Sequence, residues 1–224
     1  MRRRSGTERA RALPRSFYRR TAPALARAVL GRLLVHDGPA GRTSGLIVEA
    51  EAYRGARDPA SHAFRGRTAR NATMFGPPGR AYVYFTYGMH HCLNLVAERD
   101  GAPGAVLVRA LEPVEGLDLM AARRGVARPE RLARGPGCVA QALGLTRAHD
   151  GLDLVLGPLW LADLPARRGG RRVARGPRVG IRAGLDLPWR VYLEGHPCVS
   201  AAARPANRAR ARGTQGGRGA ALRR

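Results

Sequence analysis

The stretch GLIVEAEAYRG, residues 45–55, places two glutamates, Glu49 and Glu51, inside an otherwise apolar run. From Gly41 onward apolar residues recur at every second position, which is typical of a strand whose successive side chains point to opposite faces. The two glutamates therefore share a face with Tyr53, at a spacing of roughly 7 Å for two residues of strand. A buried carboxylate is costly unless it is paired or used in chemistry, so this strand is the first candidate for a functional site.

The composition predicts one folded domain with a basic tail at each end. The chain has 224 residues, 44% of them hydrophobic, which suffices for one sizeable core. All 40 basic residues are arginines, against 16 acidic residues. Residues 1–20 hold eight arginines and one glutamate, and residues 201–224 hold seven arginines and no acid. We expect both segments to be disordered, with the domain at residues 21–200.

The net charge of +24 favours a polyanionic partner. The tails leave an excess of ten positive charges within residues 21–200, and clustered arginine gains affinity by displacing counterions from phosphates. A merely solvated basic surface is the alternative.

Cysteine spacing and hydropathy indicate the compartment. Cys92, Cys138 and Cys198 show no CxxC pairing, so they suggest neither a disulfide framework nor a zinc site. The sequence has no secretory signal pattern and no apolar run of membrane-spanning length. We expect a cytoplasmic protein without membrane association, nucleoid-associated if the source is prokaryotic.

Helical and strand patterns interleave along the chain without βαβ spacing. Apolar residues at helical spacing predict a helix over 15–34, and composition predicts two more over 114–124 and 130–144, with RGPG at 134–137 marking a helix start. Residues 54–80 form a long polar loop, and a loop of that length inside a compact domain is usually functional or disordered.

The remaining strands are expected to be largely antiparallel. Residues 80–98 predict two strands flanking a turn at Tyr87-Gly88, and residues 104–113 predict a third. Strand composition returns in three segments near the C-terminus, 153–163, 177–184 and 189–200. The pattern favours the α+β class.

Aromatic residues and a histidine accompany the two glutamates. Tyr53 continues their face, His62 follows in the polar loop, and Tyr82 and Tyr84 share one face of the predicted hairpin. Tyr87 at the turn has little core to fill, and such a residue can wedge into duplex DNA and fill the space left by an extruded nucleotide. Flat aromatics can stack on that base, which yields about 1–3 kcal/mol. Ordinary strand tyrosines beside a salt-bridged glutamate face are the alternative.

The sequence resembles the alkyladenine (3-methyladenine) DNA glycosylase family over about residues 21–200. The motifs that carry the resemblance occur in order: GLIVEAEAYRGARDPASHAFRGRTARNATMFGPPGRAYVYFTYGMHHCLNLV at 45–96, GAVLVRALEP at 104–113, RGPG at 134–137 and PRVGI at 177–181. The resemblance implies a single mixed domain with a curved, mostly antiparallel sheet, flanking helices and a protruding β-hairpin.

The activity implied by the resemblance is base excision. A member of this family flips alkylated or deaminated purines of the 3-methyladenine, hypoxanthine and ethenoadenine class out of double-stranded DNA. Water then hydrolyses the N-glycosidic bond and leaves an abasic site. The resemblance implies no metal and no organic cofactor, and we expect a monomer.

The resemblance also assigns roles to individual residues. Glu51 matches the general base that activates the attacking water, and Glu49 is then a supporting residue. Tyr53, His62 and Tyr84 match the residues that stack on or hydrogen-bond the flipped base. Asn94 matches the amide that screens against normal guanine, and Arg109 matches a strand arginine at the active site. Tyr87 matches the intercalating tyrosine.

Three departures and absences qualify the match. Cys138 stands where a lysine near a phosphate is common, although Arg134 is close enough in sequence to replace it, and His91 stands where an aromatic residue is usual. The chain contains no lysine at all. Because strand-cleaving glycosylases commonly use a lysine Schiff base, we expect no lyase activity.

Two other functions are compatible with parts of the sequence. A basic nucleic-acid-binding protein with an inactive centre would share the charge, and only base release separates it from an enzyme. A metal-dependent nuclease would use His62, His90, His91, Cys92 and the glutamates. Adjacent histidines on a strand face opposite ways, which makes the HHC run a poor chelate.

Overall fold

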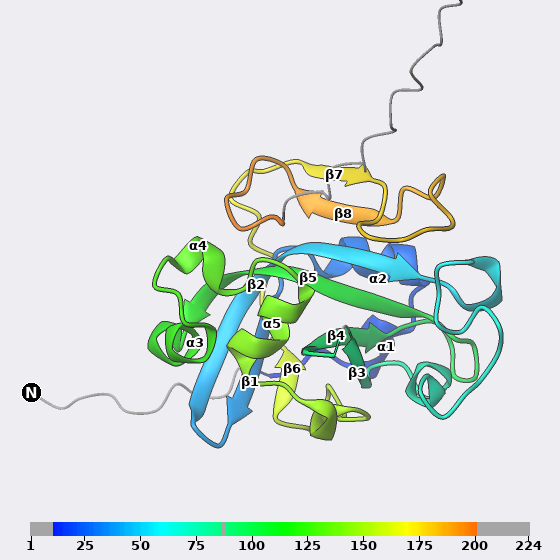
Figure 1. Cartoon of the computed structure of the whole chain (residues 1–224), viewed down its shortest axis with the longest axis horizontal. Helices are drawn as coiled ribbons and strands as arrows, with labels where there is room; N and C mark the ends of the chain where they lie inside the picture. The colour runs from blue at the N-terminus through cyan, green and yellow to red at the C-terminus, as the bar shows by residue number, and fades with distance from the viewer. Residues whose placement is uncertain (1–10, 87, 201–224) are drawn as a thin grey trace, which may run out of the picture.

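The computed structural model describes residues 11–86 and 88–200, and it confirms the α+β class. Within these residues one curled antiparallel sheet runs in the order β3-β4-β5-β2-β1-β6, with β8 paired to β2 and β7 to β8 (Figure 1). The strands are β1 (Leu33–Gly38), β2 (Gly41–Tyr53), β3 (Ala81–Thr86), β4 (His90–Val96), β5 (Ala105–Glu115), β6 (Leu159–Leu161), β7 (Val173–Gly176) and β8 (Arg190–Leu193).

The strand β2 is the centre of the sheet and carries both glutamates. Its first half pairs with β1, from Gly38↔Gly41 to Leu33↔Leu46, and its second half pairs with β8 from Glu49 to Glu51. Along its other edge β2 pairs with β5, with register shifts on both sides of Glu49. These shifts leave Arg109 without a paired residue on β2, and such bulges re-aim side chains.

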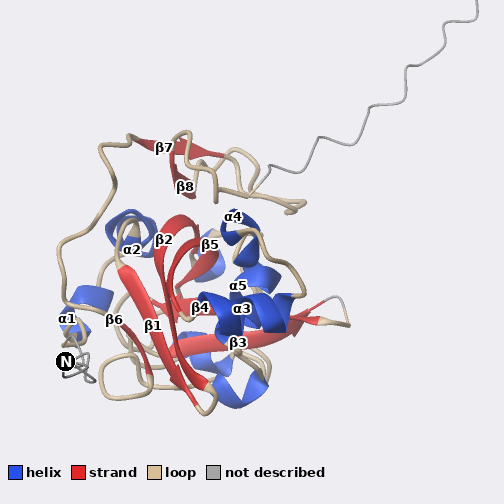
Figure 2. Ribbon diagram, turned by 90° about the vertical axis from the view of Figure 1, so that its left-hand side faces the viewer, coloured by secondary structure: helices blue, strands red, loops and turns tan. Residues whose placement is uncertain are grey.

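The helices cover both sides of the central strands. They are α1 (Arg15–Tyr18), α2 (Ala22–Val29), α3 (Leu117–Arg124), α4 (Pro129–Leu132) and α5 (Pro136–Leu143), with single 3₁₀ turns η1 (Gly55–Arg57), η2 (Ala72–Phe75) and η3 (Arg147–His149). Figure 2 shows α2 on one side of β2 and β5, and α3, α4 and α5 on the other. Leu25 and Val29 of α2, Val48 and Ala50 of β2, and Leu143 of α5 belong to one buried apolar core.

Two predicted helices are broken in the structure. The helix expected over 15–34 is split into α1 and α2, because Pro23 sits in the first turn of α2 and prolines start helices better than they continue them. The helix expected over 130–144 is split into α4 and α5. Between them the backbone runs along β5, where the Leu111 N–H donates to the Ala133 carbonyl. The predicted helix start at RGPG is confirmed by α5, whose first residue is Pro136.

Two further predictions need correction. Residues 177–184 do not form a strand; the strand in this region is β7, four residues earlier. Part of the predicted N-terminal tail also belongs to the folded domain, since Leu13, Phe17 and Tyr18 are buried in the core. Large apolar side chains at these positions are the physical reason. The predicted C-terminal tail, 201–224, lies outside the described residues.

The predicted hairpin is present as β3 and β4, which pair from Ala81↔Leu95 to Thr86↔His90. Its protrusion stays a prediction, and Tyr87 in its turn lies outside the described residues. Exposed apolar side chains flank that position, Phe85 on one side and Met89 on the other.

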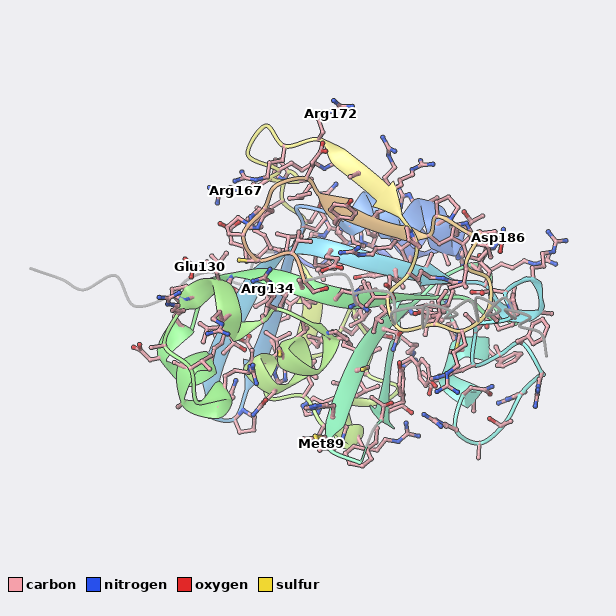
Figure 3. The ribbon with its side chains drawn as sticks, turned by 45° about the horizontal axis from the view of Figure 1, so that its top comes forward. Met89, Glu130, Arg134, Arg167, Arg172 and Asp186 are labelled. Carbon is pink, nitrogen blue, oxygen red and sulfur yellow. The ribbon has the colours of Figure 1, made fainter. Side chains whose placement is uncertain are left out.

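Positive charge gathers on the side of the molecule near β7. Arg167, Arg171, Arg172 and Arg175 are exposed there, and Figure 3 shows Arg167 and Arg172 directed away from the fold. None of the helices in residues 11–86 and 88–200 combines the length and apolar character that crossing a membrane requires.

Candidate active site

A cavity of about 470 Å³ lies against the second half of β2. Its walls come from β2, the β3–β4 hairpin, β5, the polar loop after β2 and the segment that follows β7. The lining residues used below are Tyr53, His62, Tyr82, Tyr84, Cys92, Asn94, Arg109 and Val179, together with residues 180–183. The cavity therefore gathers parts of the chain that are up to about 130 positions apart in sequence.

Glu51 lies directly behind this cavity and is fully buried. Its Oε2 accepts a hydrogen bond from the Tyr53 hydroxyl at 2.9 Å, and its Oε1 accepts one from the Val179 N–H at 2.7 Å. An Arg109 guanidinium nitrogen lies 3.3 Å from Oε2. All three partners line the cavity, so the carboxylate is held at the cavity wall by groups that also meet its contents.

Burial sets the protonation behaviour of Glu51. Removal from water raises the pKa of this carboxyl above its usual 4.5, and the charge of Arg109 together with the Val179 and Tyr53 hydrogen bonds opposes that rise. The pKa of the Tyr53 hydroxyl is raised well above its usual value by burial and by the Glu51 charge beside it. Tyr53 consequently stays a hydrogen-bond donor to the carboxylate near neutral pH.

Glu49 is also fully buried, but it sits in a denser set of donors. Its Oε1 accepts from Arg190 Nε at 2.7 Å, Arg109 Nε at 3.1 Å and Ser200 Oγ at 3.0 Å. Its Oε2 accepts from the Ser200 N–H at 2.7 Å. Arg109 thus bridges the two glutamates with one guanidinium, and the shared face predicted for the pair is confirmed by that contact.

Aromatic rings form part of the cavity wall. The rings of His62 and Tyr84 meet edge-on with centroids 4.6 Å apart, and those of Tyr82 and Tyr84 lie 5.3 Å apart. The Tyr82 hydroxyl lies 2.9 Å from His62 Nδ1. Burial lowers the pKa of His62 and nearby Arg70 lowers it further, so the imidazole is neutral at pH 7. The Asn94 amide nitrogen donates to the Tyr82 carbonyl at 3.1 Å, which fixes that amide in the wall.

A buried ion pair anchors the segment that closes the cavity. The two terminal nitrogens of Arg178 contact the two Asp58 oxygens at 2.6 and 2.7 Å, and both side chains are fully buried. The guanidinium carbon also lies 4.7 Å from the Tyr53 ring centroid and 5.3 Å from that of Trp189. This pair fixes Val179, the neighbour of Arg178 that donates to Glu51.

The chain matches one protein family over nearly the whole described fold. The profile of the family described as Methylpurine-DNA glycosylase (MPG) covers residues 16–197. The chain belongs to the methylpurine-DNA glycosylase family.

Several relatives of similar length match this member of the methylpurine-DNA glycosylase family. A protein of Methanocella arvoryzae is 49% identical over 193 residues, which cover 84% of this chain and 95% of that protein. A protein of Burkholderia cenocepacia is 51% identical over 198 residues, covering 85% and 91%. One of Methanoculleus marisnigri is 51% identical over 191 residues, covering 84% and 98%. Each carries the name "Putative 3-methyladenine DNA glycosylase".

The structure of this methylpurine-DNA glycosylase family member brings most of the predicted site residues together. The cavity is lined by all five residues predicted for the base pocket, namely Tyr53, His62, Tyr84, Asn94 and Arg109. Glu51 touches that lining from behind. Tyr87, predicted to intercalate, lies outside the described residues.

Several members of the site were not predicted. The Asp58–Arg178 pair, the Val179 N–H and the Arg190–Ser200 cluster around Glu49 were all missed. The PRVGI motif at 177–181 was the available signal, since it contains Arg178 and Val179. No pattern in the sequence links it to Asp58, 120 positions earlier.

The departures from the family pattern lie outside the Glu51 contacts. Cys138 is partly exposed in α5, and Arg134 just before that helix donates from Nε to the Val199 carbonyl. His91 packs against Phe85 with ring centroids 5.1 Å apart. Across residues 11–86 and 88–200, no group of three or more histidine, cysteine or acidic side chains is placed to hold a metal ion.

Proposed function

We propose that this protein is a monofunctional DNA glycosylase of base-excision repair. It accepts an alkylated or deaminated purine, flipped out of double-stranded DNA, in the cavity beside Glu51. Water hydrolyses the N-glycosidic bond, which releases the free purine and leaves an abasic site. The damaged-base class is that in the names of the relatives, 3-methyladenine, extended to hypoxanthine and ethenoadenine.

The observation that carries the proposal is the setting of Glu51. A carboxylate offers about four acceptor positions, and Tyr53, Val179 and Arg109 occupy three of them. The remaining position can take a proton of the attacking water, which is the task of a general base. A buried negative charge also stabilises the oxocarbenium-like sugar that forms as the bond breaks.

The aromatic wall suits a flat base. Tyr53, His62 and Tyr84 present ring faces or edges to one 470 Å³ volume, and stacking favours planar bases of several kinds. A neutral His62 carries no positive charge that would repel a cationic purine. We assign to Asn94 the screening against the exocyclic amine of normal guanine; its position in the cavity wall supports this assignment.

Insertion into the duplex is assigned to the hairpin turn. Tyr87 is the wedge, and it is flanked by the exposed side chains Phe85 and Met89. Apolar side chains at such a tip unstack base steps in the minor groove. Tyr87→Ala should weaken base flipping and damage search more than the chemical step. Unchanged flipping and unchanged excision in this variant would remove the assignment.

The test is base release from three duplexes that each contain one hypoxanthine, one ethenoadenine or one 3-methyladenine. Wild type, Glu51→Gln and the control Glu115→Gln, at the exposed end of β5, are compared in the presence of a chelator. Release by wild type and Glu115→Gln but not by Glu51→Gln supports the proposal. Release by Glu51→Gln at the wild-type rate contradicts the role of Glu51.

The absence of lysine supports a glycosylase without strand-cleaving activity. The products are then the free purine and an intact strand with an abasic site. Trapping with borohydride during the reaction checks this directly, because a Schiff base would be reduced to a covalent protein–DNA adduct. Such an adduct would show that another amine acts as the nucleophile.

A basic DNA-binding protein without catalysis is the second candidate, favoured by the exposed arginines near β7. Both functions give salt-sensitive binding, so binding does not separate them. Tight, salt-sensitive binding with no base release from any of the three duplexes would establish this second function.

A further inference from the structure

The two buried glutamates share one guanidinium but are satisfied to different degrees. Glu49 receives donors from two arginines and from both the backbone and side chain of Ser200, at 2.7 to 3.1 Å. Glu51 receives two neutral donors and a single longer arginine contact of 3.3 Å. The arginine side chains of this cluster therefore bind Glu49, which does not face the cavity, more closely than they bind Glu51.

This division of charge matters for a general base. A carboxylate held by strong charged hydrogen bonds loses basicity, because those bonds favour its ionised form. If Arg109 paired with Glu51 alone, through its fork of two nitrogens, the carboxylate would give up much of its tendency to take a proton from water. Glu49 prevents this pairing by holding Arg109 Nε at 3.1 Å.

We infer that Glu49 is a positioning residue that, held by Arg190 and Ser200, keeps Arg109 divided between two carboxylates and so preserves the basicity of Glu51. This inference rests on the proposed function of Glu51. Arg190 enters through Glu49 and Ser200: it donates to Glu49 and to the Ser200 carbonyl, 3.1 Å away. Ser200 also contacts Arg109 directly, since its Oγ accepts from an Arg109 terminal nitrogen at 3.3 Å. Together Arg190 and Ser200 fix the carboxylate that holds Arg109.

The groups that face Glu51 come from two strands and one connecting segment. Tyr53 and Glu49 lie on β2 with it, Arg109 comes from β5, and the segment after β7 supplies the Val179 N–H. Arg190 of β8 is paired with Glu51 in the strand register, but the Arg190 guanidinium is directed to Glu49. Among these groups, the negative charge of Glu49 raises the pKa of Glu51 and that of Arg109 lowers it.

The test compares the ionisation of Glu51 in wild type and Glu49→Gln. The carboxyl ¹³C signal of Glu51, assigned by its loss in Glu51→Gln, is titrated in the free protein. The single-turnover rate of 3-methyladenine release is measured over the same pH range. In Glu49→Gln we expect both midpoints to move to lower pH by about one unit or more, as for an acid that gains a full arginine partner. The plateau rate should fall less than in Glu51→Gln, where loss of the base costs about 10²–10⁴-fold.

Two further variants separate this effect from damage to the fold. Glu49→Asp keeps the charge and should have a midpoint closer to wild type than that of Glu49→Gln. The double variant Glu49→Gln, Arg190→Gln removes both members of one buried pair, so that neither charge is left uncompensated. It should shift the midpoint in the same direction. Glu112→Gln is the matched control: it lies on β5, pairs with His196 and should leave the midpoint unchanged.

Each outcome bears on the inference. Glu51 midpoints that stay at the wild-type pH in Glu49→Gln and in the double variant would overturn it and reduce Glu49 to a structural ion pair. The carboxyl titration requires no DNA and no turnover. If wild type released no base, the proposed function would fail, while the ¹³C midpoints would still decide whether Glu49 controls Glu51.

Discussion

The Asp58–Arg178 pair offers the sharpest test of how this site is held together. Asp58 Oδ1 accepts from Arg178 and from the Ala60 N–H, and Oδ2 accepts from Arg178 and from the Arg54 N–H. In Asp58→Asn one oxygen becomes an NH₂ group. In either orientation of the amide, its NH₂ group points at one guanidinium N–H and one backbone N–H, so that donors face donors. The charge of Arg178 is also left unpaired in a fully buried position.

The expected cost follows from these contacts. Breaking a buried ion pair by removing one partner costs about 3–5 kcal/mol, and we expect the free energy of unfolding of Asp58→Asn to fall by that amount. Base release should fall as well, since Arg178 fixes the position of Val179 beside Glu51. The loss of activity should persist at temperatures where the variant is fully folded.

Urea unfolding and single-turnover base release measure the two effects. Asp186→Asn, an exposed aspartate of the same segment (Figure 3), is the control and should match wild type in both assays. The double variant Asp58→Asn, Arg178→Met removes the unpaired charge and should recover part of the stability but not the activity. A stability loss below about 1 kcal/mol in Asp58→Asn would refute the reasoning, because that is the range of an exposed pair.

Four further predictions concern pH, stability and salt. Excision of hypoxanthine should show both an acid and a basic limb, because a neutral purine leaves poorly unless protonated while Glu51 must be ionised; a flat pH–rate profile would contradict this. Raising the pH from about 4.5 to 7.5 should lower the melting temperature of wild type relative to that of Glu51→Gln, since a carboxyl with a raised pKa loses its stabilising effect as pH rises. A difference between the two melting temperatures that does not change with pH would count against the buried charge. Because the pKa of His62 is lowered, the neutral imidazole stabilises the fold above pH 6.5, its usual pKa, and this contribution is lost as the pH falls further. In His62→Phe the melting temperature should therefore depend less on pH just below 6.5, and an unchanged dependence would refute the lowered pKa. Deleting residues 204–224 should reduce the salt dependence of DNA binding, because each lost contact between an arginine and a phosphate lowers the slope of log K against log salt concentration by about 0.9. The order of preferred lesions should stay the same; a changed order in competition assays would show that the segment takes part in lesion choice.

The sequence was most informative where one strand carried both pattern and chemistry. The alternation around Glu49 and Glu51 predicted β2 and the shared face of the two carboxylates, since a strand's period depends only on the local backbone. The β3–β4 hairpin was predicted for the same reason. Arg109 was matched to the site by resemblance, but its lack of a strand partner comes from a register shift between β2 and β5. That shift depends on pairing across 60 positions and has no local signature.

The errors arose where tertiary contacts overrode local preference. Residues 15–34 have helical spacing, yet Pro23 starts a new helix and the chain enters β1 at Leu33. The segment 177–184 contains the strand-forming residues Val179 and Ile181, but Arg178 forms an ion pair with Asp58 and the Val179 N–H donates to Glu51. Ion pairs between residues 120 positions apart cannot be read from either segment alone.

The attachment of Ser200 to Glu49 spans 151 positions of the chain. During synthesis from the N-terminus, β2 and its glutamates leave the ribosome long before the residue that completes their hydrogen bonds. Contacts of such long range also form slowly, because the loop that they close must lose its freedom first. A nascent chain therefore carries both acidic side chains without their full set of partners until nearly all of the domain has been made. Premature termination between residues 84 and 200 would yield chains that contain the tyrosines of the cavity but lack Ser200, which completes the hydrogen bonds of Glu49.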